Sequence, residues 1–373
     1  MKDRLDYTTG ARRFAIQHPL LSHAFTQAGF WIVAYMLLAV IVHLASVNIA
    51  LSFSITIETS LWPIILVGAI TGFLYGFALG LLDYFFDKQF FRNKSLGKII
   101  ILKSVMSLVI LILCFNFLRF VLYDAIMAPS FSNYSPVLSE ANWINLFLII
   151  VIYSFFMILI ITFIIQVNKK YGPGVLLPLL LGKYREPKEE ERIFMFMDLK
   201  SSTSIAEELG HIKYSGFIRD SFMDINRMLN LYNAEVYQYV GDEIVISWKI
   251  NEKIENMIAV QFFFACEEQF KSRSDYYIKN YGLVPCFKAG LHMGKVTAVE
   301  IGEIKRDIAY HGDTLNTAAR IQSMCNQYDK NFLVSANFTK ASKWNELFKT
   351  EELGMIMLKG KKIPVGILSI EQI

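Results

Sequence analysis

Residues 236–248 read VYQYVGDEIVISW, and this stretch decides how the second half of the chain is expected to fold. Two apolar runs rich in β-branched and aromatic residues flank Gly241-Asp242, a pattern that predicts two antiparallel strands joined by a tight turn. Gly and Asp both tolerate the backbone angles of such a turn, so the dipeptide can be turn chemistry alone. The carboxylate gains a functional meaning only if another part of the chain requires it.

The segments around this hairpin alternate between strand and helix patterns. The predicted elements are, in chain order, a strand at 193–197, a helix from Ser201 to about Leu231, the hairpin, a helix from about Glu252 to Phe270, a strand pair at 285–301 turning near Gly294, and a helix start at 311–322. The order βαββαβ predicts an α+β domain of ferredoxin-like type, with an antiparallel sheet and helices on one face.

Asp198 follows the first predicted strand, and in a ferredoxin-like sheet that strand neighbours the hairpin that carries Asp242. The two carboxylates are therefore expected to lie side by side, where they repel each other unless a cation lies between them. Carboxylate oxygens suit Mg²⁺ or Mn²⁺. Backbone amides at the helix start after Asp198 are free to bind phosphate. Asn316 and Arg320 are spaced i, i+4, so they share one helix face.

The first half of the chain has a different composition. Of all 373 residues 54% are hydrophobic, the mean hydropathy is +0.38, and the excess lies before residue 168. A membrane crossing takes about 20 apolar residues. Four stretches are long enough, namely Ala24–Ala45, Trp62–Leu82, Ile100–Leu122 and Ile144–Val167. The sequence predicts a four-helix transmembrane bundle in the lipid bilayer.

Basic residues set the predicted topology, because Lys and Arg are enriched in cytoplasmic loops. They flank the spans on one side only, at Lys2, Arg4, Arg12, Arg13, Lys88, Arg92, Lys94, Lys98, Lys169, Lys170, Lys183 and Arg185. We expect a multi-pass protein of the inner or plasma membrane, with both termini and the soluble domain in the cytoplasm. The net charge of +4 is mild and argues against a nucleic-acid partner.

Predicted boundaries divide the chain into a membrane domain at 1–168, a linker or coupling segment at 169–190, and a cytoplasmic domain at 191–373. The second predicted span has Gly68, Gly72, Gly76 and Gly80 at every fourth position, which forms a smooth stripe on a helix. That stripe fits either a contact between two chains or packing within one bundle.

Five pieces of the second half, taken together and in order, resemble the class III nucleotidyl cyclases, which are adenylate and guanylate cyclases. They are FMDLKSST, YVGDEI, AGLHMG, GDTLNTAAR and LKGKKIPV, and the resemblance covers about residues 190–373. Each piece alone is a weak signal, but five in the family's order are specific. The resemblance implies ATP or GTP as substrate and two Mg²⁺ or Mn²⁺ ions in each active site.

The resemblance also implies the roles of the first group of site residues. Asp198 and Asp242 match the two metal-binding aspartates of the family, and Leu199 matches the position whose backbone carbonyl touches a metal ion. Ser201, Ser202 and Thr203 match the segment whose backbone N–H groups hold the triphosphate.

A second group matches the part of the family's site that the partner domain supplies. Asn316 matches the asparagine that orients the ribose, Arg320 the arginine that stabilises the transition state, and Lys359 the lysine that contacts the phosphates. Because the family builds each site between two catalytic domains, a chain with one such domain is expected to form a homodimer with two sites.

Two positions depart from the family pattern for reading the base. Gln238 stands where family adenylate cyclases usually have Lys, and Ala309 stands where they have Asp, Thr or Ser. A Gln amide pairs with adenine in one orientation and with guanine in the other, and Ala adds no hydrogen bond. Guanylate cyclases typically have an acid at the first position, so ATP is the favoured substrate.

The sequence therefore predicts a membrane-bound adenylate cyclase that makes 3′,5′-cyclic AMP and pyrophosphate. Three alternatives remain open: a guanylate cyclase, a degenerate cyclase-like domain that binds nucleotide without turnover, and a diguanylate cyclase, whose hairpin motif is similar. Identification of the product separates the enzymes, and release of pyrophosphate separates them from a binding module.

Overall fold

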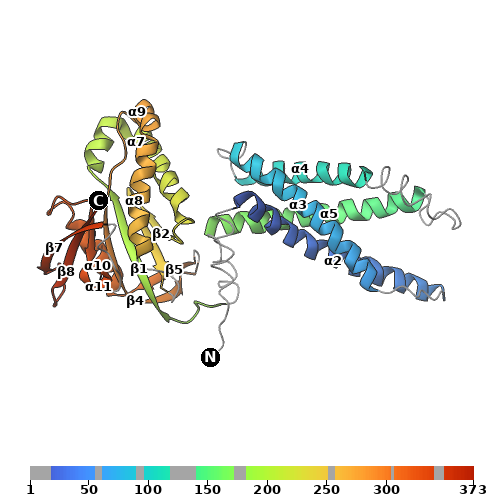
Figure 1. The fold of residues 1–373 in the computed structure, drawn as a ribbon. Coiled ribbons are helices and arrows are strands. Elements are labelled where there is room, and N and C mark those ends of the chain that lie inside the picture. The colour runs from blue at the N-terminus through green and yellow to red at the C-terminus, as the bar shows by residue number, and fades with distance from the viewer. Residues whose placement is uncertain are drawn as a thin grey trace. The chain divides into compact units, whose positions relative to one another are not determined.

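The computed structural model describes residues 18–54, 61–89, 96–117, 140–171, 182–250, 257–303, 306–339 and 348–373. Its contacts divide the chain into two compact units, Met1–Leu176 and Leu177–Ile373. Figure 1 shows the first as a group of long helices and the second as a twisted sheet with helices packed on it.

The described part of the first unit contains four helices, α2 (Pro19–Ser52), α3 (Leu61–Gln89), α4 (Leu96–Phe117) and α5 (Glu140–Tyr171). Three described segments are long and apolar enough to cross a membrane, namely Pro19–Ser52, Leu61–Phe85 and Trp143–Val167. The crossing predicted for α4 stays a prediction, and its expected end at Leu122 lies outside the described residues.

The glycine stripe packs within the chain, against α2. A Cβ at Gly68 would lie 2.8 Å from the carbonyl oxygen of Tyr35, and one at Gly76 would lie 2.7 Å from the Cα of Ala28. Gly72 and Gly80 likewise leave no room between the two helix backbones. Of the two interpretations left open by the sequence, the structure has the intra-chain contact.

A buried polar group joins α2, α3 and α4. The side-chain amide of Gln27 donates to Oδ2 of Asp83 at 2.8 Å, and the ammonium nitrogen of Lys103 lies 3.4 Å from the same oxygen. The side chains of Lys103 and Asp83 are only 3% and 8% exposed. An ion pair so deeply buried needs both partners, because removal of one leaves an unpaired charge.

The second unit contains an eight-stranded sheet in the order β2-β3-β1-β4-β6-β8-β7, with β5 paired to β4. Its elements are β1 (Lys188–Leu199), α7 (Ser202–Leu229), β2 (Glu235–Val240), β3 (Glu243–Lys249), α8 (Met257–Ser272), α9 (Ser274–Tyr281), β4 (Phe287–Ile301), β5 (Asp307–His311), α10 (Asp313–Ser323), β6 (Phe332–Ser335), α11 (Ala336–Thr339), β7 (Phe348–Ile356) and β8 (Val365–Gln372).

The predicted α+β, ferredoxin-like arrangement is confirmed. β1 lies between β3 and β4 and is antiparallel to both, and β2 is antiparallel to β3. The chain then extends the sheet beyond the βαββαβ unit, through the parallel pair β4–β6 and the antiparallel pairs β6–β8 and β7–β8.

The expectation that all helices cover one face of the sheet was wrong. Successive side chains of a strand point to opposite faces. In β1, Ile193 and Met195 belong to the core shared with α7 and α8, whereas Phe194 belongs to a second cluster that contains Ala318 of α10. The α10 helix therefore covers the opposite face, and β1 is apolar on both sides because both faces are buried.

The predicted turn near Gly294 was also wrong, because β4 runs without a break from Phe287 to Ile301. Gly294 pairs with Arg192 of β1. A Cβ at Gly294 would lie 2.7 Å from the hydroxyl oxygen of Thr314 in α10. Gly294 thus allows a helix to approach the strand closely, and a glycine can have this role inside a strand as well as in a turn.

Candidate active site

Asp198 lies at the end of β1, on the α10 face of the sheet. The alternation of the strand fixes this placement, since Met197 and Leu199 point into the core with α7 and α8. The side chain of Asp198 is 24% exposed. The apolar part of β1 thus holds a carboxylate at the rim of the sheet, where solvent reaches it.

Asp242 occupies the hairpin turn between β2 and β3, beside Gly241, which has a φ of +62°. The pKa of Asp198 is raised, first by burial, while Lys288 lowers it and Asp242 raises it by charge and by a side-chain hydrogen bond. The structure therefore brings together the two carboxyl groups that the sequence predicted to be neighbours.

Two further side chains contact Asp198, and the sequence analysis identified neither. The ammonium nitrogen of Lys288 in β4 lies 3.2 Å from Oδ2 of Asp198, and the side-chain amide of Gln322 in α10 donates to the same oxygen at 3.2 Å. Lys288 is the register partner of Asp198 in the β1–β4 ladder. The pairing of β1 with β4 could have identified Lys288 as a neighbour of Asp198. The predicted turn near Gly294 divided β4 into two strands, so no register between β1 and β4 was predicted.

Glu243 adds a third carboxyl group. It is the register partner of Asp198 in the β1–β3 ladder, so both side chains lie on one face of the sheet. Burial, Asp198 and Asp242 together raise the pKa of Glu243 to about 7. The site thus gathers three carboxyl groups, and Lys288 is the cation that contacts Asp198.

The segment Ser201–Thr203 starts α7 directly beside the two aspartates. Ser201 has a left-handed backbone with a φ of 57°, and the helix begins at Ser202. The first backbone N–H groups of a helix have no partner within it, which makes this position suited to a phosphate. Tyr214, one further residue that the sequence analysis missed, shares a side-chain hydrogen bond with Ser202, and its pKa is raised by burial and then by Asp242.

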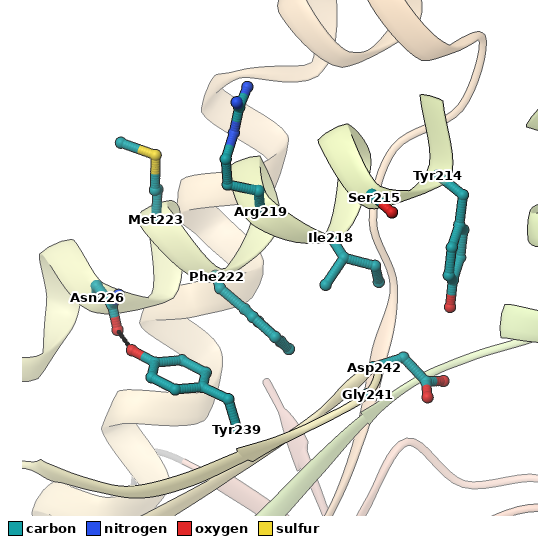
Figure 2. A pocket seen from close by; sticks show the side chains of 10 residues that line it. All are labelled: Tyr214, Ser215, Ile218, Arg219, Phe222, Met223, Asn226, Tyr239, Gly241 and Asp242. Atoms are coloured by element: carbon teal, nitrogen blue, oxygen red, sulfur yellow. Dashed lines mark hydrogen bonds between the residues drawn. The ribbon is translucent and has the colours of Figure 1, made fainter. Parts of the chain in front are cut away.

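A surface cavity of about 600 Å³ adjoins this site between α7 and the β2–β3 hairpin. Figure 2 shows Tyr214 and Asp242 at the same end of the cavity, with Ile218 and Phe222 pointing from α7 toward the β2–β3 hairpin. Most of the lining is therefore apolar. Polar side chains also line it, namely Ser215, Arg219 and Asn226, and Asp242 supplies the carboxylate at one end.

Asn316 and Arg320 lie on the outer side of α10, away from its buried residues Ala318 and Ile321. The loop that contains Lys359 runs beside them, since a Cβ at Gly360 would lie 3.3 Å from a guanidinium nitrogen of Arg320. The structure thus gathers these three predicted residues in one place.

An ion pair fastens the same loop to the start of α10. The ammonium nitrogen of Lys361 lies 2.6 Å from Oδ2 of Asp313. This contact lowers the pKa of Asp313.

Gln238 and Ala309 lie on two strands that an aromatic contact joins. Gln238 is exposed and follows a bulge at Tyr237 in β2, while Ala309 in β5 is buried. The backbone N–H of Tyr310 donates to the hydroxyl of Tyr237 at 3.3 Å. Gln238 is adjacent in sequence to Tyr237, and Ala309 is adjacent to Tyr310, so the contact between the two tyrosines holds the strands of both predicted base-reading residues together.

The predicted residues form two groups within one chain. Asp198, Asp242 and the Ser201–Thr203 segment make the first, and Asn316, Arg320 and the Lys359 loop make the second. Within the part of the chain that the structure describes, Asn316 and Arg320 make no hydrogen bond or ion pair with either aspartate. The first group supplies carboxylates and backbone N–H groups, and the second supplies an amide, a guanidinium and an ammonium group.

The donor set of the first group fits a hard divalent cation. The described residues contain no cluster of three or more His, Cys, Asp or Glu side chains arranged for a metal. Mg²⁺, however, is commonly bound by one or two carboxylates together with substrate phosphates and waters. Asp198 and Asp242 supply such a pair, and the side chain of Leu199 is buried, so only its backbone is available to a ligand.

Comparisons with known proteins identify relatives of this chain. The family model described as "Adenylate and Guanylate cyclase catalytic domain" matches residues 185–369. Adenylate cyclase 2 of Rhizobium meliloti (strain 1021) is 34% identical over 210 residues, which cover 56% of this chain and 58% of that protein. Guanylate cyclase 2D of Rattus norvegicus is 26% identical over 192 residues, which cover 51% of this chain and 17% of that protein.

Among solved structures, a bacterial light-regulated adenylyl cyclase matches with a TM-score of 0.49 and 21% identity. The match covers 59% of this chain and 64% of that one. The chain therefore spans less than two thirds of the length of each of these proteins.

Proposed function

Because residues 185–369 belong to the family of class III adenylate and guanylate cyclase catalytic domains, we propose that the chain is a membrane-anchored adenylate cyclase. It converts ATP to 3′,5′-cyclic AMP and pyrophosphate at sites shared between two identical chains. One observation carries this proposal: the two aspartates lie together beside a helix start, while Asn316 and Arg320 face outward from another helix.

Asp198 and Asp242, with the backbone carbonyl of Leu199, would hold two Mg²⁺ or Mn²⁺ ions together with the substrate phosphates. Such ions neutralise the triphosphate and lower the pKa of a bound hydroxyl group. The chain's own residues explain why a cation is needed, since Asp242 and Glu243 lie near Asp198 and Lys288 contacts only Asp198 among the three.

The remaining residues bind and orient the nucleotide. Backbone N–H groups of Ser201, Ser202 and Thr203 bind the phosphates at the start of α7. Lys288 leaves Asp198 for a phosphate oxygen when the nucleotide arrives, because an ammonium group on a long stem moves easily. Lys359, on the loop beside Arg320, contacts the phosphates from the other side.

The reaction is an in-line displacement at the α-phosphorus. The 3′ oxygen of the ribose forms the new bond to phosphorus, the bond to the β-phosphate oxygen breaks, and pyrophosphate leaves with its electron pair while the hydroxyl proton passes to water. Asn316 holds the ribose so that the 3′ oxygen is aligned. Arg320 neutralises charge that develops on the phosphorus oxygens.

A homodimer follows from the separation of the two groups. Asp198 and Asp242 of one chain meet Asn316, Arg320 and Lys359 of its partner, and the reverse pairing makes the second site. The apolar helices of the first unit anchor the chain in the bilayer, with both termini and the catalytic domain on the cytoplasmic side, where ATP is available. No nucleic-acid partner is proposed.

A guanylate cyclase is the second candidate, and one observation favours keeping it. The exposed amide of Gln238 is able to pair with either purine, and Ala309 offers no hydrogen bond. The identity of 34% with an adenylate cyclase, against 26% with a guanylate cyclase, supports ATP.

The product decides between these candidates. The purified full-length chain is incubated with ATP or with GTP, in Mg²⁺ or Mn²⁺, and the product is identified by mass spectrometry. The proposal predicts cyclic AMP and pyrophosphate from ATP. Cyclic GMP as the main product would replace adenylate with guanylate cyclase, and bound nucleotide without pyrophosphate release would contradict the enzymatic proposal.

A further inference from the structure

We propose that Gln322 is a positioning residue whose side-chain amide holds the carboxylate of Asp198 for a metal ion, within the same chain. This inference rests on the proposed function for the role of Asp198. It assigns to α10 a second task besides presenting Asn316 and Arg320.

The contact itself is specific and sheltered. Gln322 is 7% exposed, and its amide nitrogen lies 3.2 Å from Oδ2 of Asp198. Lys288 contacts the same oxygen. Two donors on Oδ2 leave the other oxygen as the natural one for a cation. Hydrogen bonds of this kind orient metal-binding carboxylates and tune their affinity.

The two donors differ in what they do when substrate arrives. Lys288 is charged and flexible, so a triphosphate attracts it away from Asp198. Gln322 is neutral and buried, and it belongs to a packed helix, so a triphosphate does not attract its amide away from Asp198. The amide is thus the donor that persists through the reaction.

The backbone around Gln322 fixes where its side chain starts. A Cβ at Gly290 of β4 would collide with the backbone nitrogen and Cα of Gln322, so the helix lies directly on the strand at this point. Gly290 and Lys288 are two residues apart in β4 and share a face of the sheet. This close approach brings the Gln322 amide within reach of Asp198 in the adjoining strand β1.

The side of α10 opposite Gln322 carries Arg320, which the proposed homodimer directs to the second active site. Successive residues of an α-helix are rotated by about 100°, so the directions of Gln322 and Arg320 around the helix differ by about 160°. Asn316 shares the Arg320 side and is exposed. In the proposed homodimer, α10 therefore contributes Arg320 to one site and supports Asp198 of the other.

Metal binding tests the role without relying on turnover. Binding of Mn²⁺ to the full-length chain is measured by electron paramagnetic resonance, in the presence of 3′-deoxy-ATP, which lacks the attacking hydroxyl. Gln322→Met keeps the volume and removes the donor, and it should weaken Mn²⁺ binding about 10- to 100-fold.

Gln327→Leu is the matched control, since Gln327 is exposed just beyond the end of α10, and it should bind Mn²⁺ as the unmodified chain does. Thermal unfolding of each variant verifies that it is folded. A folded Gln322→Met chain with unchanged Mn²⁺ affinity overturns the inference. An unmodified chain that neither binds Mn²⁺ with nucleotide nor cyclises ATP overturns the proposed function instead.

Mixed dimers test whether Gln322 acts within its own chain. An Asp198→Ala chain and an Arg320→Ala chain, carrying different tags, are co-expressed and purified as pairs, so that one intact site remains. Gln322→Met in the Arg320→Ala chain, which keeps its aspartates, should lower activity at limiting Mn²⁺ about 10- to 100-fold. In the Asp198→Ala chain the same substitution should change nothing. Equal losses, or the reverse pattern, contradict the assignment.

Discussion

Each of the two units contains an aspartate held by a lysine and a glutamine, and the two groups differ in their surroundings. In the helical unit, Oδ2 of Asp83 receives Gln27 at 2.8 Å and lies 3.4 Å from Lys103. In the sheet unit, Oδ2 of Asp198 receives Gln322 at 3.2 Å and lies 3.2 Å from Lys288. The same three residue types are thus arranged in the same way at two places.

The difference lies in charge balance and access. Asp83 is 8% exposed, and the single charge of Lys103 balances it. Asp198 is 24% exposed, and Asp242 and Glu243 place two further carboxyl groups near it. The charges of the first group balance each other, and the group joins three helices. The second retains unbalanced negative charge that a divalent cation would neutralise, and this difference distinguishes a site from a structural contact.

The largest expected effect is on turnover at the second group. Asp242→Ala should leave folding nearly unchanged, because a turn carboxylate contributes little to stability, and should reduce cyclic nucleotide production at least about 1,000-fold, or about 4 kcal/mol in activation free energy. Rates and thermal unfolding of the purified full-length variant measure the two effects. Near-normal activity of Asp242→Ala would contradict the proposal that the Asp242 carboxylate binds a metal ion needed for turnover.

The next effect is on stability at the first group. Lys103→Met leaves Asp83 buried without its cation and should destabilise the helical unit by about 3–5 kcal/mol. Adding Asp83→Asn should recover a large part of that loss, since no charge then remains unpaired. Unfolding of the detergent-solubilised chain, followed by circular dichroism, measures both variants.

The matched change in the sheet unit is Lys288→Met, which should change stability by only about 1 kcal/mol because solvent reaches Asp198. It should nevertheless lower turnover, since Lys288 is proposed to bind phosphate. Equal losses of stability from the two lysine substitutions would mean that the groups do not differ as described.

Acid should affect the sheet unit through His292, a buried histidine of β4. His292 is 8% exposed and contacts the hydroxyl of Ser335 at 2.7 Å. Burial, and then Lys361, lower the pKa of His292 from 6.5 to about 4. A depressed pKa means that stability is present above pH 6.5 and is lost as the pH falls toward 4.

The expected loss from His292 alone is about 2 kcal/mol between pH 7 and pH 5. Urea unfolding of the full chain and of His292→Gln at both pH values measures it, because the variant should lose less stability on acidification. Parallel losses in the two proteins would show that other groups account for the acid effect.

The smallest effect concerns a glycine. Gly294→Ala should displace the Thr314 hydroxyl from its 2.7 Å hydrogen bond to the carbonyl of Lys295 and destabilise the sheet unit by about 1 kcal/mol. In a Thr314→Ala background the same change should have almost no effect, because the obstructing oxygen is gone. If Thr314→Ala and the Gly294→Ala/Thr314→Ala double variant unfold at different urea concentrations, an atom other than the Thr314 hydroxyl must clash with the new methyl group.

Local patterns were enough to predict the framework of the fold. Continuous apolar runs predicted β1 and the hairpin strands, and their order predicted the ferredoxin-like sheet. The turn at Gly294 was mispredicted because glycine is frequent both in turns and at close contacts, and only the position of Thr314 in α10 separates the two cases.

The candidate site was predictable to the extent that its residues belong to continuous motifs. Asp198, Asp242, Asn316 and Arg320 each lie in such a motif. Lys288 and Gln322 reach Asp198 through strand register and through helix packing on Gly290, respectively. Neither relation exists in the sequence before the sheet is assembled, which explains why both residues were missed.

Complementation between two inactive chains tests the shared site most directly. Asp198→Ala and Arg320→Ala chains are each purified alone and as co-expressed pairs, and cyclic AMP formed from ATP is measured per pair. The proposal predicts negligible product from either variant alone and clear recovery in the mixed pairs, because one site is then intact. Mixed pairs that form but remain inactive, or an Arg320→Ala chain that is fully active alone, would contradict it.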